Sequence, residues 1–304
     1  MDNQNKYIRF DWAIKHMLRD KANFGILEGL ISVLLNEEVK ISEILESESN
    51  QENAYDKFNR VDIKAKNSKG QIIIVEVQLT RELYYLQRIL YGTCRAITEH
   101  IDLGDKYDRI VKVYSISILY CDFGQGDDYV YHGVTRFKGL HTGNDLLINM
   151  KEEGVIVPHL PKEVFPEYYL LRVNTYTNIP QTPLDEWMEY LKTGVVKEDT
   201  RTPGLQQVKE KLRMLNMTPQ ERRAYDAHVD AIMTQNDVLD TAREEGREEG
   251  REEGRKEGRK EGRAEGREEG KLEIAIKMLK SGIDMETVSQ ISGFTVEQLT
   301  KATC

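Results

Sequence analysis

The sequence predicts an α/β or mixed α+β domain with a helical C-terminal extension. Segments with apolar residues at helical spacing alternate with strand-like runs between residues 7 and 180, as expected for a sheet with helices before and between its strands. Beyond residue 180 the chain is polar and mostly helical in pattern. Its 304 residues suffice for one sizeable core and a less compact part.

The elements of the first 180 residues follow from apolar periodicity and from turn residues. The turn-rich stretch CDFGQGDD separates two apolar runs that we interpret as a strand pair. The predicted helices are Phe10–Leu18, Phe24–Leu35 and Leu83–Ile101, and the predicted strands are Val61–Lys66, Gln71–Leu79, Ile110–Tyr120, Tyr129–Phe137 and Tyr168–Val173.

Two of these strands belong to the stretch Arg60–Thr80, RVDIKAKNSKGQIIIVEVQLT, which is predicted to form a β-hairpin. A three-residue hairpin loop commonly ends in a glycine in the left-handed conformation. The loop is therefore placed at Ser68–Gly70, and Asn67 pairs with Gln71. Side chains alternate along a strand, so three apolar residues are expected to point into a packed layer: Ile73, Val75 and Val77.

The same register brings two acids together. Lys64 faces Ile74 and Asp62 faces Glu76, which puts the Cβ atoms of the two acids about 5 Å apart. Gln78 shares the face of Glu76. Like charges set opposite each other are destabilising unless a positive charge lies between them, and carboxylates without histidines suit Mg²⁺ or Mn²⁺. One interpretation is therefore a metal site.

Two other interpretations of these residues remain open at this stage. The strand could lie at the edge of the sheet, with Glu76 and Gln78 in water. Alternatively, Lys64 or Lys66 could neutralise the acid pair without any metal ion.

The hairpin resembles the PD-(D/E)xK nuclease motif, in which one strand supplies an Asp and the next supplies Glu-x-Lys. The chain resembles more closely the recombination-promoting nuclease (Rpn) or transposase-like branch, where Glu-x-Gln replaces Glu-x-Lys, as in Glu76-Val77-Gln78. This likeness implies a restriction-endonuclease-like core, a mixed sheet flanked by helices. The other stretches that carry it are FDWAIKHML at Phe10–Leu18, LQRILYGTC at Leu86–Cys94, GDKYDRIVKVYSISIL at Gly104–Leu119, the glycine-charge repeat and the helical tail.

The resemblance assigns roles to individual residues. Asp62 and Glu76 are implied as metal ligands, and Gln78 occupies the position of the motif's lysine. Asp11 matches the acid of the family's first helix and is implied as a further metal ligand. Lys15, one turn later on the same helix face, could supply the charge that Gln78 lacks, although a plain amphipathic helix explains Asp11 and Lys15 equally well.

Two residues of the helix after the hairpin are candidates for DNA contact. Arg88 and Tyr91 lie three positions apart, so they share one helix face. Arg88 either contacts phosphate or pairs with an acid.

The implied activity is hydrolysis of a phosphodiester by a Mg²⁺- or Mn²⁺-dependent DNA endonuclease that promotes recombination. Glutamine can hydrogen-bond a water but contributes no charge, so we expect weak activity or strong dependence on the identity of the metal. The alternatives are a nuclease fold that binds DNA or protein without cutting, and an oligomeric scaffold.

Composition limits these alternatives. The formal net charge of -9 disfavours binding to the phosphate backbone unless a local basic face or metal ions offset the acids. The odd number and wide spacing of Cys94, Cys121 and Cys304 disfavour a disulfide framework and a zinc site. No signal peptide or membrane-spanning run is expected, so the protein is predicted to be soluble and cytoplasmic.

The C-terminal extension is divided into three predicted parts after the nuclease-like domain of residues 1–180. Residues 181–242 form a helical brace, which begins at PLDEWMEYLK. Residues 243–271 contain the repeat REEG, with ten basic and eleven acidic residues and seven glycines. Each glycine weakens an isolated helix by about 1 kcal/mol relative to alanine. The repeat is therefore either a solvated charged linker or a helix, which is frayed in isolation or ordered by self-association. The chain is therefore expected to form homo-oligomers through this region.

Residues 272–304 are predicted to form a small helical tail. Gly282 ends its first helix, and the short helices that follow resemble a helix-turn-helix. Only Lys280 and Lys301 follow residue 277, so we favour a protein-contact or capping bundle over DNA reading. The apolar residues expected in its small core are Ile274, Met278, Leu279, Val288, Ile291 and Leu299.

Overall fold

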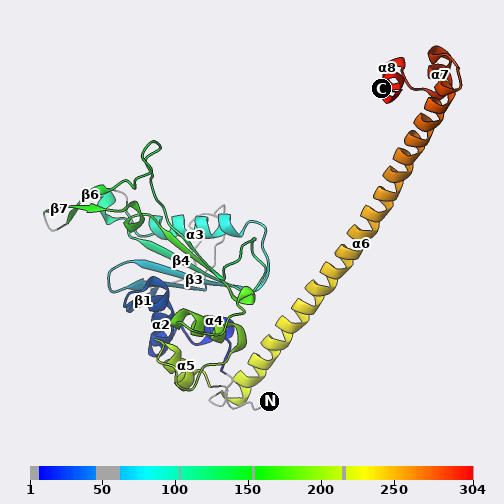
Figure 1. Ribbon diagram of the computed structural model, residues 1–304. Helices are drawn as coiled ribbons and strands as arrows, with labels where there is room; N and C mark the ends of the chain where they lie inside the picture. The colour runs from blue at the N-terminus through cyan, green and yellow to red at the C-terminus, as the bar shows by residue number, and fades with distance from the viewer. Residues whose placement is uncertain (1–6, 46–61, 103, 153–154, 214–216, 304) are drawn as a thin grey trace. The chain divides into compact units, whose positions relative to one another are not determined.

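The computed structural model describes residues 7–45, 62–102, 104–152, 155–213 and 217–303 (Figure 1). The chain divides into two compact units, Met1–Val229 and Asp230–Cys304. Among the described residues, no helix combines the length and the apolar character needed to cross a membrane.

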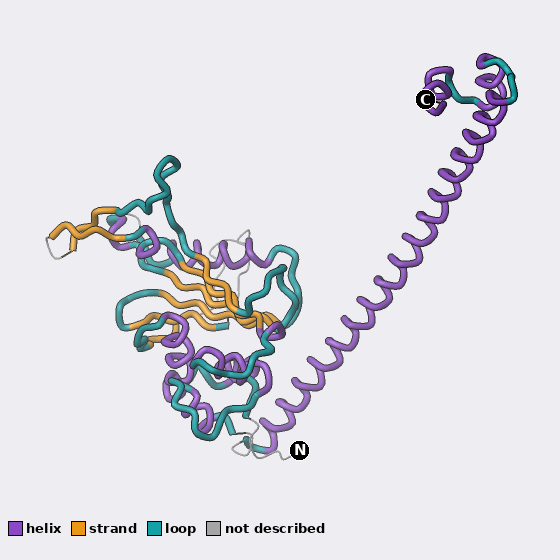
Figure 2. Tube along the Cα trace, in the orientation of Figure 1, coloured by secondary structure: helices purple, strands orange, loops and turns teal. Residues whose placement is uncertain are grey.

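The first unit is built around a six-stranded mixed sheet with the order β1-β2-β3-β4-β8-β5. Figure 2 draws the strands in orange. The inner pairs β3–β4 and β4–β8 are parallel, and the pairs β1–β2, β2–β3 and β5–β8 are antiparallel. The predicted mixed sheet flanked by helices is therefore confirmed. The strands are β1 Ile41–Leu45, β2 Ile63–Asn67, β3 Ile72–Gln78, β4 Val113–Leu119, β5 Val130–Gly133 and β8 Glu167–Arg172.

Helices cover both faces of this sheet, with α3 on one side and α2 and α4 on the other (Figure 1). The alternation along β3 explains the two layers. Ile73, Val75 and Val77 pack in the main core with residues of α1, α2 and α4, as predicted, whereas Ile72 and Ile74 pack with Ala96 of α3. The helices are α1 Phe10–His16, α2 Phe24–Leu35, α3 Tyr85–Thr98, α4 Pro183–Thr193 and α5 Leu205–Lys211.

The β2–β3 hairpin has the predicted register. Lys64 pairs with Ile74, and the backbone N–H of Asn67 donates to the carbonyl of Gln71 at 3.0 Å. Gly70 closes the loop with φ +78°, in the left-handed region that glycine adopts without a steric cost.

Close packing between α2 and the segment before α5 depends on two glycines. A Cβ atom on Gly29 of α2 would lie 2.3 Å from the Cα of Gly204, and Gly204 itself has φ +82°. The two backbones therefore touch where no side chain larger than hydrogen fits.

The predicted pairing around CDFGQGDD is wrong, because β8 lies between β4 and β5. Strand β4 is buried along almost its whole length, so it needs a neighbour on each side, and parallel β3 and β8 supply them. The half-exposed β5 suits the edge. The sequence patterns also missed β1 and the separate hairpin of β6 Ile148–Glu152 with β7 Val155–His159.

Helix α6, Pro219–Lys280, includes the whole charged repeat. Of the two conformations that the sequence left open, the structure has the helix. A Cβ atom added to any glycine of the repeat would meet no side chain or other described segment within 4 Å. Ion pairs such as Lys256–Glu252 at 3.5 Å connect successive turns. The predicted boundary between residues 242 and 243 lies inside this helix, and the division into domains stays a prediction.

The second unit ends in a small bundle of α6, α7 Met285–Ser292 and α8 Val296–Thr303. Its buried core is Ala275, Val288 and Leu299, with Met278 and Leu279 packed against it. The placement of Ile274 and Ile291 in this core is wrong, because their exposed fractions are 60% and 65%. A bundle this small has too few buried positions for every apolar residue of its helices.

Candidate functional site at the end of strand β3

Glu76 and Gln78 lie on the face of β3 that α3 covers. Strand β3 runs between β2 and β4, and the exposed fractions of Glu76 and Gln78 are 5% and 8%. The interpretation of an edge strand with both side chains in water is therefore wrong. A buried carboxylate needs compensating partners, and the surroundings of Glu76 show which ones the fold provides.

Asp62 stands immediately before β2 and faces the end of β3. Ile63 pairs with Val75, and continuing that antiparallel register by one residue places Asp62 opposite Glu76. The Asp62 Oδ2 accepts the backbone N–H of Val77 at 2.6 Å, which holds the carboxylate against the strand that carries Glu76. The structure thus brings the two acids of the hairpin together.

The electrostatics of Glu76 reflect both its burial and its neighbours. Burial raises the pKa of Glu76 to about 7 from its ordinary 4.5. The positive charge of Arg88 opposes this change, and the negative charge of Asp62 adds to it. Around neutral pH the carboxyl group is thus divided between its protonated and ionised forms, and a cation placed beside the two acids would favour ionisation.

Arg88 of α3 supplies the positive charge next to Glu76. Its Nη2 lies 3.3 Å from Glu76 Oε2 and donates to Gln78 Oε1 at 2.8 Å, and its Nε lies 3.0 Å from Glu82 Oε2. The structure shows the pairing with acids that the sequence offered as one role for Arg88, and its contact with DNA stays a prediction.

The lysines of β2 do not neutralise this pair. Lys64 binds Glu99 at 2.6 Å, and Lys66 lies 3.8 Å from Glu43. Each lysine has an acidic partner outside the hairpin, Glu99 at the end of α3 and Glu43 of β1. The second alternative for the hairpin acids is therefore also wrong.

Two residues around Glu76 escaped the sequence analysis. The buried Tyr85 hydroxyl donates to Glu76 Oε2 at 3.4 Å, and Glu82 accepts from Gln78 Nε2 at 3.1 Å. Tyr85 and Arg88 lie three positions apart on α3, a spacing that could have been read as one helix face turned toward β3. Glu82 precedes the helix, and no periodic pattern identifies it. Tyr91, one turn beyond Arg88, is 36% exposed.

Asp11 and Lys15 have other surroundings. Among the described residues, the side-chain partners of Asp11 are Arg9, with Nε at 2.9 Å, and His228, with Nε2 at 3.0 Å. Helix α1 packs in the main core, on the face of the sheet opposite Glu76, and Lys15 is exposed to solvent. The structure does not bring these two residues to Asp62 and Glu76, and their catalytic roles stay predictions.

The oxygen donors at this site fit a hard divalent cation. Asp62 and Glu76 provide carboxylates, and Gln78 provides an amide oxygen, which are the ligand types that Mg²⁺ and Mn²⁺ prefer. In the part of the chain that the structure describes, no three acidic, histidine or cysteine side chains form a group that could hold a metal ion. Mg²⁺ is commonly bound by one or two carboxylates, with water and substrate phosphate in its remaining coordination positions.

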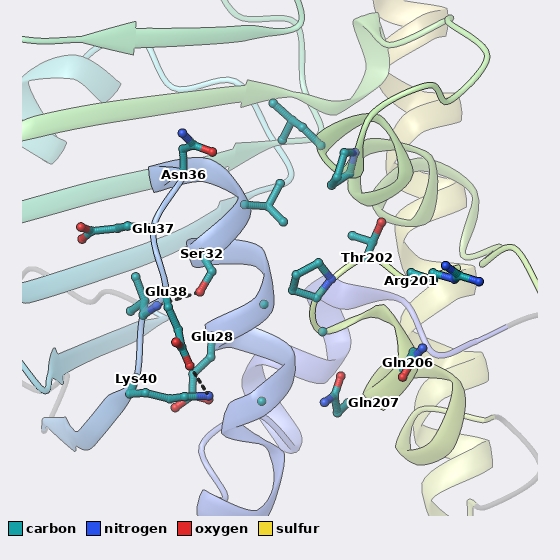
Figure 3. Close-up of a pocket in the computed structure, with 18 of the residues that line it drawn as sticks. Glu28, Ser32, Asn36, Glu37, Glu38, Lys40, Arg201, Thr202, Gln206 and Gln207 are labelled. Atoms are coloured by element: carbon teal, nitrogen blue, oxygen red, sulfur yellow. Dashed lines mark hydrogen bonds and ion pairs between the residues drawn. The ribbon is translucent and has the colours of Figure 1, made fainter. Parts of the chain in front are cut away.

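A pocket of about 790 Å³ lies elsewhere in the first unit. Figure 3 shows it between α2, with Glu28 and Ser32, and the segment that carries Arg201 and Gln206. None of the predicted site residues lines it. One of its acids, Glu28, accepts the backbone N–H of Ile41 at 2.8 Å and so holds β1 in place.

Comparison with known proteins returned two family matches. The model of the PD-(D/E)XK nuclease family transposases matches residues 8–242. The model of the Rpn/YhgA-like nuclease family C-terminal HTH domain matches residues 268–303. No curated protein and no solved structure matches the chain. The resemblance inferred from the hairpin motif and the tail is therefore confirmed.

Proposed function

Since the chain belongs to the PD-(D/E)XK nuclease family transposases, we propose that it is a divalent-metal-dependent DNA endonuclease that hydrolyses a phosphodiester during recombination. The observation that carries this proposal is the pair Asp62 and Glu76, held against one strand end with Gln78 beside them. Mg²⁺ or Mn²⁺ is the proposed cofactor.

Each residue of the pair has a defined part in the proposed reaction. A bound divalent cation would lower the pKa of a water and neutralise charge on the phosphate. The Val77 N–H fixes one carboxylate oxygen of Asp62, Oδ2, and the other oxygen, Oδ1, is the proposed metal ligand. Glu76 becomes a ligand once it is ionised. Gln78 Oε1 keeps one lone pair that can orient the attacking water, because Arg88 occupies only the other.

The proposed partners are DNA and further copies of this chain. Tyr91 is exposed on α3, one turn beyond Arg88, and can stack on a base. The C-terminal match to an HTH domain supports a DNA-related role for the whole chain. The exposed Ile274 and Ile291 of the tail support self-association there, which would bring together the two sites that double-strand cleavage needs.

The test is cleavage of supercoiled plasmid by the purified full chain with Mg²⁺ or Mn²⁺. Nicking is expected with either metal, and Asp62→Asn should abolish it, because asparagine keeps an acceptor for the Val77 N–H but loses the charge. Glu43→Ala, which removes an exposed acid of β1, should cleave normally. Calorimetry with Mn²⁺ should show binding to the wild type and weaker binding to Asp62→Asn.

Other results would support the alternatives. A chain that binds plasmid but cuts it with no divalent metal would be a DNA-binding module on a nuclease fold, which the glutamine at the lysine position would explain. A chain that neither binds nor cuts DNA, and that becomes monomeric when residues 243–304 are deleted, would be a scaffold.

A further inference from the structure

The glutamine at position 78 leaves the predicted site without the cation that the Glu-x-Lys motif carries. We infer that Arg88 of α3 is a positioning residue that restores this positive charge at Gln78 and Glu76. The inference rests on the proposed nuclease function.

The contacts of Arg88 hold its guanidinium beside Glu76 and Gln78. Nη2 donates to Gln78 Oε1 at 2.8 Å and lies 3.3 Å from Glu76 Oε2. The guanidinium carbon lies 5.0 Å from the centre of the Tyr85 ring, within the range of a cation–π contact. Arg88 Nε also lies 3.0 Å from Glu82 Oε2. These contacts fix the guanidinium charge in place before substrate binds.

The hydrogen bonds also define which way the Gln78 amide points. Arginine only donates hydrogen bonds, and a backbone carbonyl only accepts them. Gln78 Oε1 must therefore face Arg88, and Nε2 must face the carbonyl of Thr80, to which it donates at 2.6 Å. Arg88 consequently orients the amide oxygen as well as placing a charge beside it.

No lysine proposed from the sequence takes this place. Lys15 is exposed on α1, and Lys64 and Lys66 pair with Glu99 and Glu43. The positive side chain that the motif places on the strand is thus provided here by Arg88 of the helix that covers the strand, and its charge lies at the same strand end.

The test compares single-turnover cleavage rates for Arg88→Ala, Arg88→Lys and the double variant Arg88→Ala with Gln78→Lys. Loss of one preorganised donor that contacts developing charge costs about 10²- to 10³-fold in rate. Arg88 acts through Gln78 and Glu76, so we expect Arg88→Ala to slow cleavage at saturating DNA by up to about that factor. Arg88→Lys should retain part of the rate. The double variant should recover most of it, because its lysine restores the charge directly from β3.

Three controls separate this role from a structural one. Arg95→Ala removes the same charge from the same helix at a residue that pairs with Glu99, and it should cleave normally. The thermal unfolding temperature should show that each variant is folded. Mn²⁺ binding measured by calorimetry should persist in Arg88→Ala, because the carboxylates of Asp62 and Glu76 are unchanged.

The outcomes are distinguishable. If wild-type protein cuts no DNA, the proposed function is overturned and this role with it. If wild-type protein cuts and Arg88→Ala cuts equally well, only the role of Arg88 is overturned. A folded double variant that stays as slow as Arg88→Ala would also refute it, because a lysine at position 78 would then not substitute for Arg88.

Discussion

Substitution of Glu76 by glutamine should change how the stability of the first unit depends on pH. The folded chain binds the Glu76 proton more tightly than the unfolded chain does, because the pKa rises from 4.5 to about 7. Raising the pH through this interval therefore costs the folded state free energy. At 1.36 kcal/mol per pKa unit the full cost is about 3 kcal/mol.

Only part of that cost falls within a convenient experimental range. Between pH 5.5 and pH 8.5, proton linkage for these two pKa values gives about 2 kcal/mol. Glu76→Gln removes the titrating group while keeping the shape, and Arg88 retains Glu82 and Gln78 as partners. The stability of the variant relative to wild type should therefore increase by about 2 kcal/mol between these pH values.

Urea denaturation without divalent metal, followed by tryptophan fluorescence, measures this difference. Both tryptophans, Trp12 and Trp187, are buried in the first unit and report on its unfolding. Glu99→Gln is the control with the opposite sign. Lys64 and Arg95 outweigh partial burial and lower the pKa of Glu99, so that variant should lose stability at high pH and regain it on acidification. An equal pH dependence in wild type and Glu76→Gln would refute the reasoning.

Glycine substitutions test the packing and the long helix. Gly29→Ala places a Cβ atom 2.3 Å from Gly204 Cα, so urea denaturation should show a loss of about 1–3 kcal/mol or more. Gly25→Ala on the same helix meets nothing closer than 3.5 Å and should be neutral or stabilising by up to about 1 kcal/mol; equal losses would contradict the packing. A Cβ atom at Gly258 would meet no other segment within 4 Å. Gly258→Ala should therefore retain more helical circular dichroism signal than wild type when the full chain is heated, and equal signals would contradict the helical repeat.

Local patterns were sufficient for much of the fold and for the centre of the site. The loop at Ser68–Gly70 fixed the register of the hairpin, and with it the meeting of Asp62 and Glu76, because turn geometry and side-chain alternation both act over a few residues. The predicted range of α2, Phe24–Leu35, matches the helix of the structure. Strand order failed where pairing joined distant segments, as when β8 came between β4 and β5.

The partners of the buried charges depended on the tertiary structure. Asp11 is held by His228, 217 residues further along the chain, and no local pattern connects the two. The sequence left open whether Arg88 contacts phosphate or pairs with an acid, and the packing of α3 on β3 placed it at Glu76 and Gln78. The alternation of apolar residues and the turn residues, both local features of the sequence, thus define which side chains share a strand face. The cation that a buried carboxylate receives is decided only when helices pack on the sheet, because electrostatic compensation depends on distance in space and not along the chain.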